Sequence, residues 1–167
     1  MVTDEIVAAT DEALRQVAEP RFLRTERGFH GRFYCALHQV LEKKGLLENG
    51  CILEMEYQKS NRHGTNKRPD IVLHVPAEES GARVDENNFA VWALKRRASE
   101  SKAREDFEKL DVMFGTLCYP LGIFVNIDTR HHRADCYVGR FPDRLRTVAV
   151  WQDDTVQTSW GSPAKQG

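Results

Sequence analysis

The most informative segment of this chain is FAVWALKR, at residues 89–96. Its first six residues are apolar, and strand alternation puts every second residue on one face: Phe89, Val91, Ala93 and Lys95. A strand that is apolar on both faces is typical of the interior of a sheet. We therefore expect residues 89–96 to form a central strand that turns polar only at Lys95.

Two amphipathic helices lie on either side of this strand in the sequence. Residues 25–44 and 100–117 repeat apolar side chains at spacings of three and four, with Thr25 and Ser99 as N-cap candidates. Weaker patterns predict a helix over 3–18 and strands over 51–58, 69–75, 122–127, 134–141 and 147–153. This order predicts an α/β protein with a central mixed sheet of four to six strands flanked by helices. We expect a helical N-terminal extension over 1–24, the main domain over 25–155 and a tail over 156–167.

Charge and cysteine content exclude several classes of protein. The 167 residues include 24 lysines and arginines against 25 acids, which argues against a polycationic binder but allows a local basic cleft. The cysteines form no CxxC pair and are expected to be reduced and mostly buried: Cys35, Cys51, Cys118 and Cys136. We find no export pattern and no apolar run long enough to span a bilayer, so we expect a cytoplasmic protein without a membrane partner.

Three charged residues lie at positions where chemistry and ordinary structure compete as explanations. Glu26 shares the apolar stripe of its helix, but a first-turn acid also suits the helix dipole. Asp70 heads an apolar strand, where it also fits a turn; joined by a third acid, the two carboxylates would form an oxygen cage suited to Mg²⁺ or Mn²⁺. Lys95 either marks the solvent end of its strand or orients a water and steadies phosphate charge.

Together these residues resemble the PD-(D/E)XK phosphodiesterase superfamily, which has the restriction-endonuclease-like fold. The matching positions are Glu26 on an early helix, Pro69-Asp70 at the head of the second strand and Ala93-Leu94-Lys95 late in the third. The helix that carries Asp106, Lys109 and Leu110 then follows as in the family, and the resemblance covers about residues 25–127. It implies a restriction-endonuclease-like fold and a metal-dependent nuclease.

Ala93 departs from this pattern, because the family has a metal-binding Glu or Asp at that position. Three explanations compete: an engineered substitution that inactivates the site, a natural protein that only binds nucleic acid, or another acid in the role. For the last, Glu54 and Glu56 on the neighbouring strand are the nearest candidates in the sequence. We favour the first explanation, because Glu26, Asp70 and Lys95 all remain.

The resemblance also implies a mechanism. Glu26, Asp70, an acid at position 93 and the backbone carbonyl of Leu94 would hold one or two Mg²⁺ or Mn²⁺ ions, which polarise the scissile phosphate and activate a water. Lys95 would position that water, and the products would carry a 5′-phosphate and a 3′-hydroxyl.

Basic residues beside the site fit a nucleic-acid substrate, which we expect to be DNA. Residues 59–68 contain four lysines and arginines and no acid. The candidate phosphate contacts are Arg62, His63, Lys67 and Arg68 before the catalytic aspartate, and Arg96 and Arg97 after Lys95. Many nucleases of this fold act as dimers or in assemblies, so we expect a homodimer or a partner protein. The alternative function is a non-catalytic module, on the same fold, that binds nucleic acid or protein.

Overall fold

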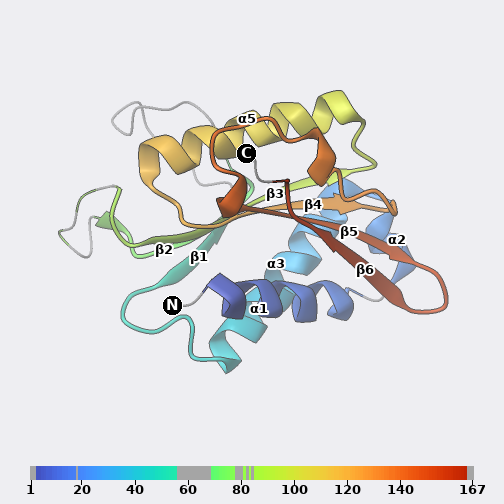
Figure 1. The fold of residues 1–167 in the computed structure, drawn as a ribbon. Coiled ribbons are helices and arrows are strands. Elements are labelled where there is room, and N and C mark those ends of the chain that lie inside the picture. The colour runs from blue at the N-terminus through green and yellow to red at the C-terminus, as the bar shows by residue number, and fades with distance from the viewer. Residues whose placement is uncertain are drawn as a thin grey trace.

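The structure is a computed structural model that describes residues 3–17, 19–55, 69–77, 81, 83 and 85–164. Its helices are α1 (Thr3–Gln16), α2 (Pro20–Leu23), α3 (Glu26–Lys43) and α5 (Glu100–Leu117), with short 3₁₀ turns η2 (Ala134–Cys136) and η3 (Pro142–Arg144). Its strands are β1 (Ile52–Met55), β2 (Ile71–His74), β3 (Asn88–Arg96), β4 (Gly122–Ile127), β5 (Leu145–Gln152) and β6 (Val156–Gly161). These elements form three layers, with one sheet between two helical layers (Figure 1).

The sheet contains six strands in the order of the sequence, β1 to β6. Strands β3, β4 and β5 run parallel, whereas β1 and β2 on one side and β6 on the other are antiparallel to their neighbours. Residues 89–96 therefore lie in the interior of a mixed sheet, as their apolar character predicts. The α/β class and the mixed sheet flanked by helices are confirmed.

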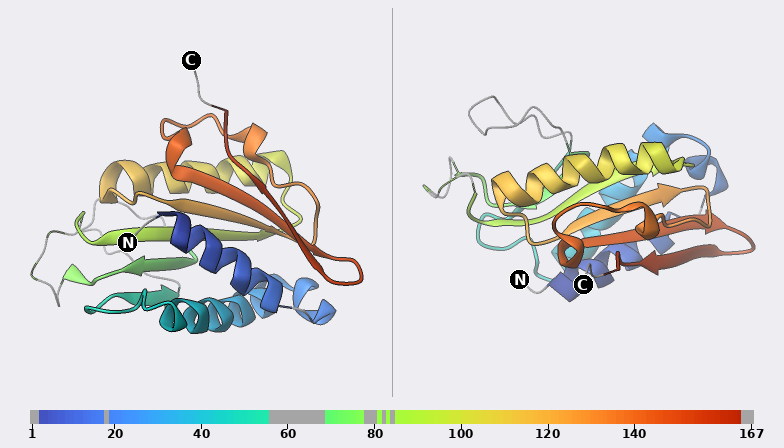
Figure 2. Two further views of the ribbon diagram at one scale, coloured as in Figure 1. Left: turned by 60° about the horizontal axis from the view of Figure 1, so that its bottom comes forward. Right: turned by 45° about the horizontal axis from the view of Figure 1, so that its top comes forward.

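One face of the sheet is covered by α1 and α3 (Figure 2). The stripe of α3 that the sequence spacing predicts is buried there: Phe29, Phe33, Leu37, Val40 and Leu41. Trp92 and Leu94 of β3 point into the same core. Helix α1 belongs to this core as well, because Ile6, Ala9, Ala13 and Leu14 are all buried in it. The helix expected as an N-terminal extension therefore packs as part of the main domain, and the expectation that it lies apart from residues 25–155 is wrong.

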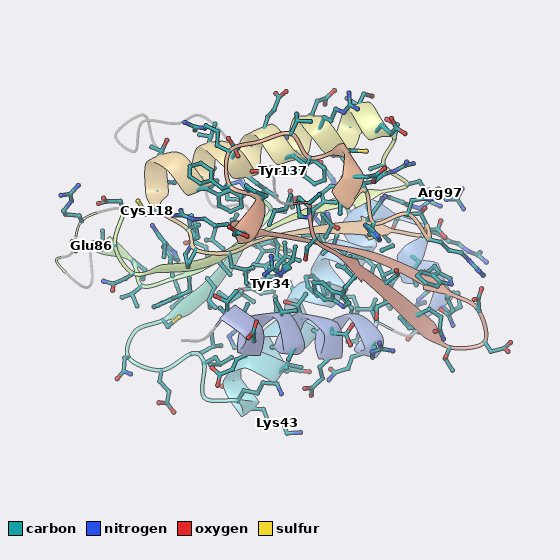
Figure 3. All side chains as sticks on the ribbon, in the orientation of Figure 1. Tyr34, Lys43, Glu86, Arg97, Cys118 and Tyr137 are labelled. Atoms are coloured by element: carbon teal, nitrogen blue, oxygen red, sulfur yellow. The ribbon has the colours of Figure 1, made fainter. Side chains whose placement is uncertain are left out.

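The opposite face of the sheet is covered by α5, and side chains fill the space between them (Figure 3). Phe107 of α5 makes edge-to-face contacts with Phe124 of β4 and with Tyr137, at centroid distances of 5.0 Å and 5.7 Å. Val91 and Ala93 of β3 point to this face. Alternate residues of β3 thus reach the two different cores.

Both long helices begin at the caps that the sequence predicts. The Thr25 hydroxyl accepts a hydrogen bond from the Gly28 amide, and the Ser99 hydroxyl accepts one from the Lys102 amide. Gly45 follows α3 with a φ of +69°, a conformation that glycine adopts without strain.

Several other expectations are wrong. Residues 134–141 form a 3₁₀ turn and a loop instead of a strand, and residues 156–161 form strand β6 instead of a tail. The strand predicted over 51–58 is observed at 52–55, and residues 56–58 lie outside the described ranges. Two of the four cysteines, Cys35 and Cys118, are exposed.

No helix in the described ranges is long and apolar enough to cross a membrane.

Candidate functional site

Asp70 lies at the head of β2, where it is fixed against the central strand. Its Oδ2 accepts a hydrogen bond of 2.7 Å from the backbone amide of Leu94, and its own amide donates to the carbonyl of Trp92 at 3.2 Å. Burial raises the pKa of the Asp70 carboxyl, and the nearby charge of Asp106 raises it further. The hydrogen bond from the Leu94 amide and the charges of His30 and Lys95 act in the opposite direction. Burial is therefore the main reason that the Asp70 carboxyl is disfavoured as an anion.

Glu26 reaches β3 from the helical layer that α1 and α3 form. It is the first residue of α3, and its Oε2 accepts a hydrogen bond of 3.1 Å from the Arg96 amide. Amides two residues apart on a strand point to the same edge and lie roughly 7 Å apart. Glu26 and Asp70 are thus held by alternate amides, those of residues 96 and 94, on one edge of β3.

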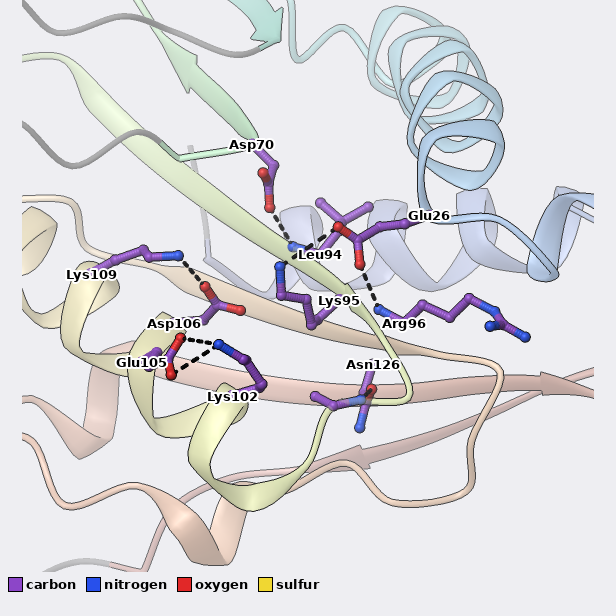
Figure 4. A network of polar contacts seen from close by, with 11 residues as sticks. Glu26, Asp70, Leu94, Lys95, Arg96, Lys102, Glu105, Asp106, Lys109 and Asn126 are labelled. Atoms are coloured by element: carbon purple, nitrogen blue, oxygen red, sulfur yellow. Dashed lines mark hydrogen bonds and ion pairs between the residues drawn. The ribbon is translucent and has the colours of Figure 1, made fainter.

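Lys95 lies between these two contacts. Its Nζ is 3.6 Å from Oε1 of Glu26, and its charge also acts on Asp70. Figure 4 shows Glu26, Asp70 and Lys95 meeting at the end of β3, although they come from α3, β2 and β3. The structure therefore brings together the three charged residues that the sequence singles out. Leu94, which was expected to offer its carbonyl to a metal, donates its amide hydrogen to Asp70. Its side chain is buried in the core under α1 and α3.

Ala93 faces a small pocket on the α5 side of the sheet. The pocket has a volume of about 40 Å³ and is lined by Pro69, Asp70, Ala93, Lys95, Asp106, Lys109, Leu110 and Met113. One water needs roughly 10–15 Å³ of such space. The pocket therefore has room for a small ion and a few waters, but not for a nucleotide base.

Asp106 of α5 is the pocket residue whose role sequence reasoning missed. Its side chain is only 6% exposed; Oδ1 accepts a hydrogen bond from Nζ of Lys109, and Oδ2 is buried without a partner among the described residues. The signal was present, because Ala103, Asp106, Phe107 and Leu110 follow the i, i+3, i+4, i+7 pattern of a buried face. An acid within such a stripe is unusual, since buried carboxylates are rarely left unpaired.

His30 also contributes to the field at the site. It lies one turn after Glu26, and its charge lowers the pKa of Asp70. Its Nε2 is buried without a hydrogen-bond partner in the described part of the chain. Its electrostatic effect on Asp70 places His30 near the site.

The donor set fits a hard cation held by few protein groups. Within the described ranges, no three histidine, cysteine or acidic side chains form a metal-binding group. Mg²⁺, however, keeps several waters and is commonly held by only one or two carboxylates together with substrate phosphates. Asp70 and Asp106 supply two carboxylates beside the pocket. These residues therefore suit a largely hydrated Mg²⁺ or Mn²⁺ ion, and not a fully enclosed one.

The other acids proposed for the missing role are not placed in the pocket. Glu54 of β1 pairs with Nε2 of His74 at 3.1 Å and does not line the pocket. Glu56 lies outside the described residues, as do Arg62, His63, Lys67 and Arg68.

The two arginines after Lys95 are both linked to Asp128. The Arg96 guanidinium contacts Asp128 and donates to the carbonyl of Leu23, so it holds α2 against the end of the sheet. Arg97 Nε lies 2.8 Å from Oδ2 of Asp128, but its side chain remains 63% exposed. Both arginines line a wide hollow of about 410 Å³ together with Pro20, Leu23, Arg24, Asp128 and Gln152. Three arginines and one acid make this hollow positive.

No protein-family model matches the chain, and neither do any curated proteins or solved structures.

Proposed function

We propose that this chain is a metal-dependent nuclease of the PD-(D/E)XK type that hydrolyses phosphodiester bonds in DNA, weakened by the alanine at position 93. The observation that carries the proposal is the anchoring of two carboxylates to one strand edge. Glu26 and Asp70 accept hydrogen bonds from the amides of residues 96 and 94, and Lys95 lies between them. The arrangement uses three separate elements, so local sequence alone does not account for it.

The residues divide the chemistry as follows. A bound Mg²⁺ ion would lower the pKa of a water and polarise the scissile phosphate. Asp70 and Glu26 supply fixed negative charge at the strand edge, and their amide contacts limit how far they can move. Lys95 places an ammonium group beside them, where it can orient an attacking water and stabilise phosphate charge in the transition state.

The positive hollow beyond Arg96 provides a path for the substrate backbone. It is continuous along the chain with the catalytic strand, because Arg96 and Arg97 directly follow Lys95. Phosphate contacts of this kind position a nucleic acid without reading its sequence. We propose that the DNA backbone passes through this hollow and presents a phosphate to the pocket beside Ala93.

The decisive test restores the missing acid. Ala93→Glu is expected to cleave plasmid DNA in Mg²⁺, and Asp70→Ala in the same background is expected to abolish that cleavage. Glu105→Gln, which removes an exposed acid of α5 paired with Lys102, is the matched control and should leave cleavage unchanged. DNA and RNA substrates are compared with and without chelator. An Ala93→Glu protein that binds Mn²⁺ but cleaves neither substrate would refute the nuclease.

A second candidate is a module that binds nucleic acid without cutting it. The observation that favours it is the internal pairing of charges, since Lys95 lies against Glu26 and Lys109 against Asp106. Such a module would bind DNA tightly, lose affinity as salt rises, and be indifferent to chelator and to residue 93. Absence of nucleic-acid affinity even at low salt would favour a protein-interaction module.

A further inference from the structure

We infer that Asp106 supplies the carboxylate that position 93 lacks, so that Asp70 and Asp106 together hold one divalent cation across the pocket. The inference deepens the proposed function, on which it rests for the role of the ion. It assigns a ligand from α5, the helix that follows the motif residues in the sequence.

The first support is the burial of Asp106. Residue 106 is 4% exposed, yet Oδ2 has no hydrogen-bond partner among the described residues. A buried carboxylate oxygen without a partner is unfavourable unless a cation or an ordered water satisfies it. The pocket beside it is polar and large enough for an ion with its water.

The second support is the position of Asp70 in the same pocket. The two aspartates belong to different layers, one to the edge of β2 and the other to α5, and both line the pocket (Figure 4). Two carboxylates that face one small polar pocket form a site that a divalent cation can bridge.

The third support is the space left by residue 93. Ala93 lines the pocket together with the two aspartates, and its side chain is a single methyl group with no metal-binding atom. The other acid described near this position, Glu54, is already paired with His74. Asp106 is therefore the described acid best placed to act in place of an acid at 93.

Lys109 contacts one of the two carboxylates of the proposed cation site. Its Nζ binds Oδ1 of Asp106, and its side chain is 38% exposed. A long side chain with this exposure can turn its ammonium group toward solvent. We expect Lys109 to leave Asp106 when the cation binds, so the two positive charges compete for one carboxylate.

The test is a Mn²⁺ titration of the full chain, followed by the electron paramagnetic resonance signal of free Mn²⁺. The wild-type chain is expected to bind one ion. Asp106→Asn and Asp70→Asn should each weaken binding by at least about tenfold, since even residues that only hydrogen-bond to a metal ligand contribute about 10–100-fold to metal affinity. Glu105→Gln, the neighbouring and exposed acid of α5, is the matched control and should bind as the wild type does.

A second variant protects the test against misfolding of the Asp106 variant. Lys109→Gln removes the competing ammonium and is expected to tighten Mn²⁺ binding by about fivefold, the effect of one unit charge across a few ångströms of water. Circular dichroism checks the fold of each protein. The inference is overturned if the wild type binds no Mn²⁺, if Asp106→Asn binds as the wild type does, or if Lys109→Gln leaves the affinity unchanged.

The results separate this inference from the proposed function. Mn²⁺ binding that depends on Asp106, without cleavage in the Ala93→Glu protein, supports the cation site and refutes the nuclease. Cleavage by the Ala93→Glu protein, with Mn²⁺ affinity indifferent to Asp106, refutes the inference and supports the nuclease.

Discussion

Two buried polar side chains, one on each face of the sheet, differ in how far their hydrogen-bonding groups are satisfied. On the face covered by α1 and α3, Thr10 is fully buried, but its hydroxyl donates to the carbonyl of Ile6 at 2.8 Å and accepts from Nε1 of Trp92 at 3.2 Å. On the face covered by α5, Asp106 is almost as buried, but one of its oxygens has no partner among the described residues. Asp70, near it, is also disfavoured as an anion.

Under the proposed function, this difference separates a structural contact from a functional one. Satisfied polar groups inside an apolar core add to stability and fix the packing. Unsatisfied charges in a small pocket lower stability, and folded proteins tolerate them where binding or catalysis needs them. The comparison therefore predicts that substitutions on the first face destabilise the fold, whereas substitutions of the pocket acids do not.

The largest effect is expected from truncation of Trp92 on the α1 and α3 face. Trp92 is fully buried and bonds Thr10, so Trp92→Ala removes a large apolar group and leaves a cavity. We expect a loss of about 3–5 kcal/mol in the free energy of unfolding, measured by urea denaturation. Trp92→Phe is the control that keeps most of the volume and should lose much less. A loss below about 1 kcal/mol for Trp92→Ala would contradict the description of this face as a tightly packed core.

A smaller effect of opposite sign is expected from Asp106. Replacing a poorly satisfied buried ion pair with an apolar side chain often stabilises a protein, and Lys109 can turn to solvent. Asp106→Leu should therefore raise the free energy of unfolding by about 1 kcal/mol while it removes Mn²⁺ binding. Glu105→Leu, on the exposed side of the same helix, should change stability by less than about 0.5 kcal/mol. Strong destabilisation by Asp106→Leu would mean that Asp106 has a structural role.

The parts of this fold that are predictable from sequence depend on local patterns. The stripe of α3, the caps Thr25 and Ser99, and the interior position of β3 all follow from spacing and residue type within one element. The meeting of Glu26, Asp70 and Lys95 follows from resemblance to a family motif and not from spacing, because the three residues come from different elements. The structure places the three side chains at the end of β3, and their catalytic role stays a prediction.

The parts that sequence reasoning missed depend on contacts between distant elements. The sequence of strand β6 has only a weak apolar alternation, so it does not predict a strand. In the structure, β6 pairs with β5, and the side chains of its Thr158 and Trp160 donate hydrogen bonds to Asp11 of α1. Residues 134–141 alternate like a strand, yet Arg133 takes a left-handed conformation and a 3₁₀ turn follows. Asp106 was visible as an acid in an apolar stripe, but only the tertiary structure shows that it meets Asp70.

The next prediction compares the caps of the two long helices. Thr25→Ala and Ser99→Ala each remove one capping hydrogen bond, so each should lower the free energy of unfolding by about 1 kcal/mol. The two should differ in function, because Thr25 caps the turn that carries Glu26. In the Ala93→Glu background, plasmid cleavage should fall with Thr25→Ala and stay unchanged with Ser99→Ala. Equal cleavage by both variants would show that the capping of α3 does not position Glu26.

The smallest effect, and the most direct contrast between the faces, concerns the pH dependence of two aspartates. Asp11 of α1 is partly buried, which alone would raise its pKa, but hydrogen bonds from Trp160, Arg15 and Thr158 hold the pKa below its ordinary value of 3.8. For Asp70 the opposite holds, because burial raises the pKa above 3.8. The ionised carboxylate therefore stabilises the fold at Asp11 and destabilises it at Asp70.

The sign of each substitution follows from this difference. Asp11→Asn should be less stable than the wild type at pH 7, and the difference should shrink as the pH falls from 3.8 through the lowered pKa of Asp11. Asp70→Asn should be more stable than the wild type at pH 7, and that gain should disappear as the pH falls through the raised pKa of Asp70 toward 3.8. Urea denaturation in the presence of chelator, from about pH 2.5 to about pH 7, measures both differences because this interval covers the titration of the carboxyl groups. If both substitutions changed the free energy of unfolding in the same direction at pH 7, the contrast between the two carboxylates would be refuted. The contrast requires that the fold favours Asp11 as an anion and disfavours Asp70 as an anion.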